Sequence, residues 1–199
     1  FMRLRKKVAL ITGAAQGLGA EIARRYAAEG ATVFVCDLKE DLGRETAAEI
    51  EKAGGKAFFQ PLDVTSEESW IKAVAAVTEK CGRLDVLVNN AGINIREPIE
   101  EMKVENLDTM LAVNVKGPFL GIKHAIPVMR TQGGGSIVNM SSIGGRLGYP
   151  KRAPYAAAKW GIVGFTKTLS TELGRYGIRV NVIQPGMVEG PRVERVMRE

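Results

Sequence analysis

Short apolar segments alternate with helix-like segments along almost the whole chain. The apolar runs cover residues 8–12, 32–36, 57–61, 84–88, 136–140 and 178–183. Helical periodicity fills most of the intervals, over residues 17–29, 42–52, 65–80, 104–130 and 155–176. Strands this apolar are buried on both faces, which is typical of parallel sheets covered by helices. The sequence therefore predicts an α/β fold, a doubly wound parallel sheet with helices on both faces, in a single domain over residues 1–199.

The composition fits an ordinary globular domain and excludes several classes of protein. The chain has 199 residues, 45% of them hydrophobic, and a formal charge of +6. Its lysines and arginines are scattered rather than gathered in a stripe, which argues against a nucleic-acid partner. No apolar run approaches the ~20 residues of a membrane-spanning helix, and no signal peptide is evident. We therefore expect a cytoplasmic protein with no membrane partner. Cys36, Cys81 and the single histidine, His124, lack metal-ligand spacing, so no metal site is expected.

A glycine-rich turn separates the first predicted strand from the first helix. Residues 12–19 read Thr-Gly-Ala-Ala-Gln-Gly-Leu-Gly. Glycines at this point let the backbone approach a pyrophosphate, whose charge is favoured at a helix N-terminus. Asp37 ends the next strand, where a carboxylate can accept hydrogen bonds from both ribose hydroxyls and would repel a 2′-phosphate. The pattern predicts that NAD is preferred over NADP, with contacts from Gly13, Gln16, Gly17, Leu18, Gly19, Asp37 and Leu38.

A tyrosine and a lysine lie one helical turn apart in the last predicted helix. Tyr155 and Lys159 are four residues apart, so they share a helix face. A tyrosine ordinarily ionises near pH ~10, and a neighbouring positive charge brings its pKa toward the range of a general acid–base. Taken alone, the same spacing also occurs on helices where the tyrosine packs and the lysine reaches into solvent.

Together these motifs resemble the classical short-chain dehydrogenase/reductase family, which has a Rossmann fold. The glycine spacing of residues 13–19 matches that subgroup, and further matches follow along essentially the whole chain. They are Asp63-Val64, Asn89-Asn90-Ala91-Gly92, Asn114, Ser141-Ser142, Tyr155 with Lys159, and Pro185-Gly186. The resemblance implies an NAD-dependent oxidoreductase that interconverts a secondary alcohol and its ketone. It also implies a homo-oligomer, a dimer or tetramer, formed through the helices predicted at 104–130 and 155–176.

The resemblance implies a role for individual residues as well. Tyr155 would be the acid–base, Lys159 would lower its pKa and bind the nicotinamide ribose, and Asn114 would hold a proton-relay water. Ser142 would polarise the substrate oxygen, since it is the serine that lies 13 residues before Tyr155, and Ser141 would have a local structural role. The remaining cofactor contacts would come from Asp63, Val64, Asn90, Ala91, Gly92, Pro185, Gly186 and Val188.

Two features depart from the family pattern. Family members usually continue beyond the sixth strand with a substrate-covering helical segment and a seventh strand, so we expect that C-terminal strand to be missing from this sequence. A threonine often follows Pro-Gly and contacts the nicotinamide carboxamide. Residues 187–192 hold none, so this anchor is not expected here.

The sequence leaves the substrate open. A hydroxy acid, a sugar or polyol, another secondary alcohol and a 3-oxoacyl thioester are all candidates. A 3-oxoacyl-[acyl-carrier-protein] reductase-like carbonyl reductase is one alternative, although such enzymes tend to prefer NADPH, against which Asp37 argues. A non-catalytic NAD-binding regulatory or scaffold protein is the other, although it would be expected to lose part of the Ser142, Tyr155 and Lys159 set. Side chains expected to line the site are Ile93, Asn94, Ile143, Gly144, Arg146, Tyr149, Arg152 and residues 187–192.

Overall fold

The computed structural model of the chain describes residues 2–188 and contains one six-stranded sheet. The strands are β1 (Val8–Thr12), β2 (Thr32–Asp37), β3 (Lys56–Pro61), β4 (Val86–Asn89), β5 (Gly135–Met140) and β6 (Ile178–Ile183). The α-helices are α1 (Gly17–Ala28), α2 (Glu40–Lys52), α3 (Glu67–Cys81), α4 (Val104–Leu111), α5 (Gly117–Thr131) and α6 (Ala153–Leu173). The short elements η1 (Ala112–Lys116), η2 (Ile143–Gly145) and η3 (Gly174–Tyr176) complete the chain.

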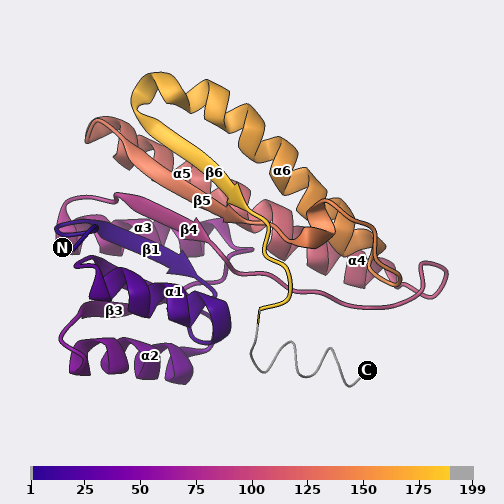
Figure 1. The fold of residues 1–199 in the computed structure, drawn as a ribbon, viewed down its shortest axis with the longest axis horizontal. Coiled ribbons are helices and arrows are strands. Elements are labelled where there is room, and N and C mark those ends of the chain that lie inside the picture. The colour runs from indigo at the N-terminus through magenta and orange to yellow at the C-terminus, as the bar shows by residue number, and fades with distance from the viewer. Residues whose placement is uncertain (1, 189–199) are drawn as a thin grey trace.

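The sheet is parallel throughout, with the strand order β3-β2-β1-β4-β5-β6 (Figure 1). The chain moves outward from β1 to β3, then returns to the other side of β1 and moves outward again to β6. The order therefore reverses between β1 and β4. In open α/β sheets, ligands bind outside the carboxyl ends of the strands at such a switch point. The predicted doubly wound parallel sheet is confirmed.

Helices cover both faces of the sheet and define two apolar cores. One core joins α1 and α2 to the sheet, for example through Ala23 and Ile50 against Val33. The other joins α3, α5 and α6 to the opposite face, around Trp70 and Ile122. Right-handed crossovers require this arrangement, because the direction of strand addition changes after β3. Within residues 2–188, no helix is both long and apolar enough to cross a bilayer.

The helix predicted over residues 104–130 is interrupted in the middle. It consists of α4 and α5 joined by η1, a single π-helical turn. A π-turn inserts one extra residue into a helix and is frequent at functional sites. Here it holds Asn114, which is completely buried. Periodicity did not predict the turn, because apolar residues continue on both sides of it.

Three other predicted boundaries shift for local reasons. The helix predicted from residue 65 begins at Glu67, because Ser66 is its N-cap and accepts the Ser69 N–H. The strand predicted from residue 84 begins at Val86, and the Leu84 N–H is donated to the Gln132 side chain instead. The last helix begins at Ala153, with a proline in its first turn, as is common at helix N-termini.

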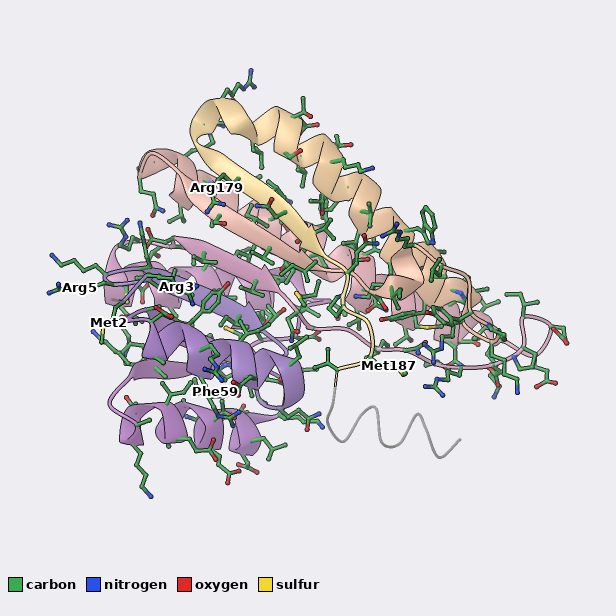
Figure 2. All side chains as sticks on the ribbon, viewed as in Figure 1. Met2, Arg3, Arg5, Phe59, Arg179 and Met187 are labelled. Carbon is green, nitrogen blue, oxygen red and sulfur yellow. The ribbon has the colours of Figure 1, made fainter. Side chains whose placement is uncertain are left out.

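The end of the sheet away from the switch point is held together by a buried carboxylate. Asp85 is 6% exposed and accepts hydrogen bonds from Lys7, Arg83 and the Val8 N–H. Desolvation acts to raise the pKa of Asp85, but these three donors together hold it below its usual value. Figure 2 shows Arg3 and Arg5 at this end of the sheet and Met187 beyond the carboxyl end of β6.

Candidate active site

The glycine turn follows β1 and leads directly into α1. Gly13 and Gly17 have φ angles of +62° and +59°, in the region that side chains disfavour. A Cβ added at Gly17 would meet no atom within 4 Å, so the turn leaves open space in front of the helix. At Gly19, an added Cβ would collide with the Gly13 carbonyl oxygen and the Asn90 side chain. The three predicted glycines therefore lie together, and Gly19 is required by close packing.

The N-terminus of α1 is suited to an anion. Gln16 occupies the N-cap position, where its side chain makes no capping hydrogen bond within the described chain, and the first turn holds no acidic residue. Uncapped helix N–H groups and the helix dipole favour a negative charge at this point. Leu18 lies in the same turn and is partly exposed. This donor set fits the pyrophosphate of a dinucleotide.

The segment after β4 braces the glycine turn from the neighbouring strand. Asn90 Nδ2 donates to the carbonyl oxygens of Thr12 (2.9 Å) and Gly13 (3.1 Å). In return, Thr12 Oγ1 accepts the backbone N–H groups of Asn90 and Ala91, both at 3.0 Å. A Cβ at Gly13 would lie only 2.8 Å from Ala91 Cα. These bonds join the two strands that flank the switch point.

Asp37 lies at the end of β2, beside the glycine turn. Its Oδ2 accepts the Ala15 N–H and its Oδ1 accepts the Lys39 N–H, each at 3.0 Å. These bonds hold a negative charge next to the N-terminus of α1, where the sequence predicts recognition of a ribose. The neighbouring Leu38 is 67% exposed, so an apolar surface adjoins the carboxylate.

Asp63 and Val64 follow β3 and already have structural partners. Asp63 Oδ1 accepts both the N–H (2.8 Å) and the hydroxyl (2.7 Å) of Thr65, which forms a local turn. Val64 is buried. Leu62, the residue before this pair, donates its N–H to the Asp37 carbonyl at 3.1 Å. The structure thus brings the pair close to Asp37, and its contact with an adenine stays a prediction.

Tyr155 and Lys159 are both buried on α6. Lys159 is 4% exposed, and its Nζ lies 5.7 Å from the centroid of the Tyr155 ring. The same Nζ donates to the Met140 carbonyl oxygen, at the end of β5, at 2.8 Å. A buried ammonium requires acceptors of this kind. The alternative of a lysine that extends into solvent is therefore wrong for this helix.

The two adjacent serines have different partners. Ser141 Oγ donates to the Lys159 carbonyl oxygen, 18 residues away, at 2.8 Å, which is a structural bond between the end of β5 and α6. Ser142 Oγ accepts the Gly144 N–H at 3.1 Å. A Cβ at Gly144 would lie 3.3 Å from Tyr155 Cε1 and 3.6 Å from Ser142 Oγ. Gly144 therefore lies between the serine hydroxyl and the tyrosine ring, where a side chain would crowd both.

Asn114 reaches the same region from the π-turn. Its Oδ1 accepts the Ile93 N–H (3.1 Å) and its Nδ2 donates to the Ile93 carbonyl oxygen (2.8 Å). A Cβ at Gly92 would lie 2.8 Å from Asn114 Oδ1 and 3.4 Å from Lys159 Nζ. Asn114, Gly92 and Lys159 are therefore neighbours. The amide of Asn114 is nevertheless engaged by the Ile93 backbone on both its atoms.

Pro185, Gly186 and Val188 follow β6 at the carboxyl end of the sheet. The Pro185 carbonyl oxygen accepts the Ile143 N–H at 2.9 Å, which ties this segment to η2, directly after Ser142. A Cβ at Gly186 would meet no atom within 4 Å, and Val188 is exposed. Of this group, Pro185 is tied by a backbone hydrogen bond to the loop that carries the serine.

Two of the predicted substrate-lining residues, Ile143 and Arg146, line an open hollow beside η2. The hollow has a volume of about 320 Å³, and its lining consists of Ile143, Arg146, Leu147 and Gln184. Nearby in the sequence, the Arg152 guanidinium lies 5.4 Å from the centre of the Tyr149 ring. Residues 189–192, which include Arg192, lie outside the described residues.

The sequence did not single out Thr12 or Met140 as parts of the site. Thr12 holds the turn after β4, and Met140 holds Lys159, as described above. Met140 acts through its backbone carbonyl, which no sequence pattern reports. For Thr12 a signal existed, because a hydroxyl residue stands at the end of an otherwise apolar strand, directly before Gly13.

The glycine turn lies at the switch point of the sheet, and a buried tyrosine and lysine lie beyond it with a serine nearby. This arrangement is the one expected of an oxidoreductase that uses a nicotinamide dinucleotide. The comparison with known proteins agrees with this class. The model of the short chain dehydrogenase family matches residues 7–199. The chain belongs to this family, whose members use NAD(P) and act on CH–OH groups.

Named relatives align over most of the chain. The trans-4-hydroxycyclohexanecarboxylate dehydrogenase of Sinomonas cyclohexanicum is 48% identical, over 98% of this chain and 78% of its own length. The cyclopentanol dehydrogenase of Comamonas sp. (strain NCIMB 9872) is 42% identical over the same shares. The crystal structure of levodione reductase superposes with a TM-score of 0.94 at 38% identity, covering 98% of this chain and 77% of that one. The chain thus spans a little more than three quarters of the length of these relatives.

Proposed function

We propose that the protein is an NAD-dependent dehydrogenase that interconverts a secondary alcohol on a carbocyclic ring and the corresponding ketone. The observation that carries this proposal is the continuous set of contacts from the glycine turn, through Asn90 and Gly92, to Asn114 and Lys159. These contacts connect the turn proposed to hold the cofactor with Lys159, the neighbour of the proposed acid–base Tyr155. The ring is proposed because two relatives are named for hydroxylated five- and six-membered carbocycles.

Tyr155 is the proposed acid–base. In the oxidation direction, its phenolate accepts the proton of the substrate hydroxyl, and in the reduction direction its phenol returns it to the carbonyl oxygen. Lys159 favours the negative charge on that oxygen, because its ammonium is buried beside the ring. The Met140 carbonyl oxygen holds this ammonium at the carboxyl end of β5, where it is proposed to bind the hydroxyls of the nicotinamide ribose.

Ser142 is the proposed donor to the substrate oxygen. Its hydroxyl oxygen already accepts the Gly144 N–H, so its proton is directed away from that bond and can be donated. Such a donor stabilises negative charge that develops on the substrate oxygen. When bound, NAD⁺ would accept the hydride that leaves the carbinol carbon, which is the redox chemistry the side chains lack.

The cofactor would be held along the switch point. The N-terminus of α1 and the three glycines of its turn would take the pyrophosphate, and Asp37 and Leu38 the adenosine ribose and its surroundings. Asp63 and Val64 would meet the adenine, while Ala91, Gly92, Pro185, Gly186 and Val188 would border the nicotinamide end. Preference for NAD is supported by the Asp37 carboxylate, which lies beside the turn and would repel a 2′-phosphate.

The proton relay is proposed to run past Asn114. Because its amide is bonded to the Ile93 backbone, a water would be held by the Asn114 carbonyl in the π-turn rather than by its side chain. Removal of the amide would then act by releasing Ile93. This distinguishes a positioning role for the side chain from direct contact with the relay water.

A homo-oligomer formed through α5 and α6 is proposed as the working state, in the cytoplasm. Phe119 on α5 and Trp160 on α6 are 48% and 54% exposed. Gly161 and Gly164 are exposed on α6, and a Cβ at either would meet no atom within 4 Å. The fold of one chain therefore does not require these glycines, whereas close packing of a second helix would. Light scattering of the purified protein, alone and with Gly164→Trp, tests the interface.

The direct test of the chemistry is Tyr155→Phe. We expect this variant to lose turnover with every alcohol while it binds NAD⁺ with nearly the wild-type affinity, measured by calorimetry. Ser141→Ala is the control, because it also removes one hydroxyl close to Lys159 but not one that is proposed to act on the substrate. The folded fraction of this variant should retain turnover. Normal turnover in Tyr155→Phe would remove the basis of the proposed mechanism.

A further inference from the structure

The two residues proposed to meet the adenine are held on both sides by consecutive residues of α3. On one side, the Asp63 N–H donates to Ser69 Oγ at 3.0 Å. On the other side, Trp70 Nε1 donates to the Val64 carbonyl oxygen, also at 3.0 Å. The peptide group that joins Asp63 to Val64 lies between these two hydrogen bonds. The first turn of α3 therefore fixes the backbone before and after that peptide group.

The polar groups that stay open in this segment are a donor and an acceptor on neighbouring residues. Among the described residues, the Val64 N–H has no hydrogen-bond acceptor. Thr65 bonds only Oδ1 of Asp63, so the second carboxylate oxygen can accept from a ligand. An adenine presents an amino donor beside a ring-nitrogen acceptor, which is the complementary pair. Such a match depends on the spacing of the two protein groups, which the backbone on either side sets.

Trp70 is itself held firmly in place. Its side chain is completely buried, so its indole N–H needs an acceptor within the protein. A Cβ at Gly121 on α5 would lie 2.5 Å from Trp70 Cη2, and one at Gly117 would lie 3.1 Å from Val64 Cβ. The two glycines are four residues apart and share one face of α5. This face allows α5 to pack directly against both the indole and the valine.

The segment held by α3 adjoins the carboxylate proposed to bind the adenosine ribose. Leu62 donates its N–H to the Asp37 carbonyl oxygen at 3.1 Å. A displacement of Asp63 and Val64 would therefore move the adenine contacts relative to Asp37. Tyr155, the proposed acid–base, lies on a different helix, α6. Such a displacement should consequently affect the adenosine end of the cofactor and not proton transfer.

We propose that Trp70 is a positioning residue for the cofactor. Its indole N–H holds the Val64 carbonyl oxygen, so that the open groups of Asp63 and Val64 are aligned for an adenine before the cofactor binds. The inference rests on the proposed function, since it requires a dinucleotide at the switch point. Trp70 acts through the backbone of this segment and has no part in the chemical step.

The experiment measures the Kd of AMP and of NAD⁺ by calorimetry, and kcat at saturating NAD⁺, in the wild type and three variants. Trp70→Phe keeps an aromatic ring and removes the N–H. It should weaken the binding of AMP and of NAD⁺ by the same factor, about fivefold, the effect of one hydrogen bond. Its kcat should equal that of the wild type. A purely structural role for Trp70 would lower the Tm and leave the Kd of AMP unchanged.

Two further variants complete the experiment. Ser69→Ala removes the bond from the Asp63 N–H, should weaken AMP in the same way, and serves as the test if Trp70→Phe does not fold. Gln132→Met is the control, because Gln132 Nε2 donates to the Leu84 carbonyl oxygen at 2.8 Å, before β4 and at the opposite end of the sheet. This variant should lower the Tm and bind AMP as the wild type does.

The outcomes separate the inference from the function on which it rests. Unchanged AMP affinity in Trp70→Phe, or in Ser69→Ala if the former does not fold, overturns the positioning role. Equal weakening in Gln132→Met overturns it too, because the effect would then be a general loss of stability. A wild type that binds AMP and NAD⁺ but oxidises no alcohol overturns the proposed reaction and leaves the role of Trp70 to the binding data. A wild type that binds neither nucleotide overturns both.

Discussion

The bracing of the glycine turn by Asn90 can be tested by removal of its amide. Asn90→Ala deletes the two hydrogen bonds from Nδ2 to the carbonyl oxygens of Thr12 and Gly13, at 2.9 and 3.1 Å. A neutral hydrogen bond contributes about 1 kcal/mol net, so the loss is about 2 kcal/mol. For a chain of this size, that corresponds to a decrease in Tm of about 4–8 °C.

The bracing by Asn90 also predicts an order of stability among its variants that the loss of side-chain volume alone would not produce. In Asn90→Asp, a carboxylate faces the same two carbonyl oxygens, so this variant should be less stable than Asn90→Ala at pH 8 and approach it as the carboxylate is protonated at low pH. Both should bind NAD⁺ more weakly than the wild type, because the turn is no longer fixed.

Urea unfolding followed by circular dichroism measures the stability, and the midpoint should shift without a change in slope. Asn106→Ala is the control, because Asn106 lies on α4 and its amide makes one long hydrogen bond, to Glu97. We expect this change to alter the free energy of unfolding by about 0.5 kcal/mol or less. If Asn90→Ala unfolds at the wild-type urea concentration, or if Asn90→Asp is the more stable of the two at pH 8, the bracing described here is refuted.

Three further predictions concern cofactor choice, acid stability and thiol reactivity. Asp37→Ser should shift the ratio of kcat/KM for NAD⁺ to that for NADP⁺ toward NADP⁺ by at least about tenfold, because the carboxylate no longer repels a 2′-phosphate, and an unmoved ratio would count against its role. Asp85→Asn should cost about 1–2 kcal/mol at pH 7, because the charge-assisted hydrogen bonds to Arg83 and Lys7 are weakened while both of these side chains stay about half exposed to solvent. The pKa of Asp85 is lowered in the folded protein, so the stabilisation from its carboxylate is complete above about pH 4 and is lost as the pH falls further. The difference in free energy of unfolding between variant and wild type should therefore become smaller in acid. A difference that does not change with pH in urea titrations would contradict this. Cys81, which is half-buried, should be alkylated by iodoacetamide in the native protein, whereas Cys36 should not, because burial raises the pKa of its thiol; mass spectrometry that finds Cys36 modified first would contradict the packing of β2.

The sequence predicted the parts of this fold that depend on local pattern. The six strands are runs of apolar residues, and Gly13, Gly17 and Gly19 stand where a turn and close packing require them, so both could be read from residue types. The π-turn at Asn114 could not be predicted, since the apolar periodicity of the helix continues through it. Its cause is tertiary: the Asn114 amide is bonded to Ile93, in a segment that follows a strand distant in the sequence.

The candidate site likewise has features that the sequence predicts and features that depend on tertiary contacts. The proximity of Tyr155 and Lys159 could be predicted, because residues four apart share one helix face. The partner of the lysine, the Met140 carbonyl, comes from β5 and carries no signal in the sequence. The same holds for Trp70, because the Val64 carbonyl that accepts its indole N–H is also a backbone group.

The central claim is NAD-dependent oxidation of a cyclic secondary alcohol, and its most direct test is the rate of NADH formation. Purified enzyme would be given cyclopentanol, cyclohexanol and the cyclohexanediols, with NAD⁺ and NADP⁺ in parallel, beside Tyr155→Phe. We predict NADH formation with at least one of these alcohols, a higher kcat/KM with NAD⁺ than with NADP⁺, and a rate in Tyr155→Phe lower by about 10²–10⁴-fold. Reduction of neither cofactor by any of the alcohols, or equal rates in the wild type and Tyr155→Phe, would contradict the account.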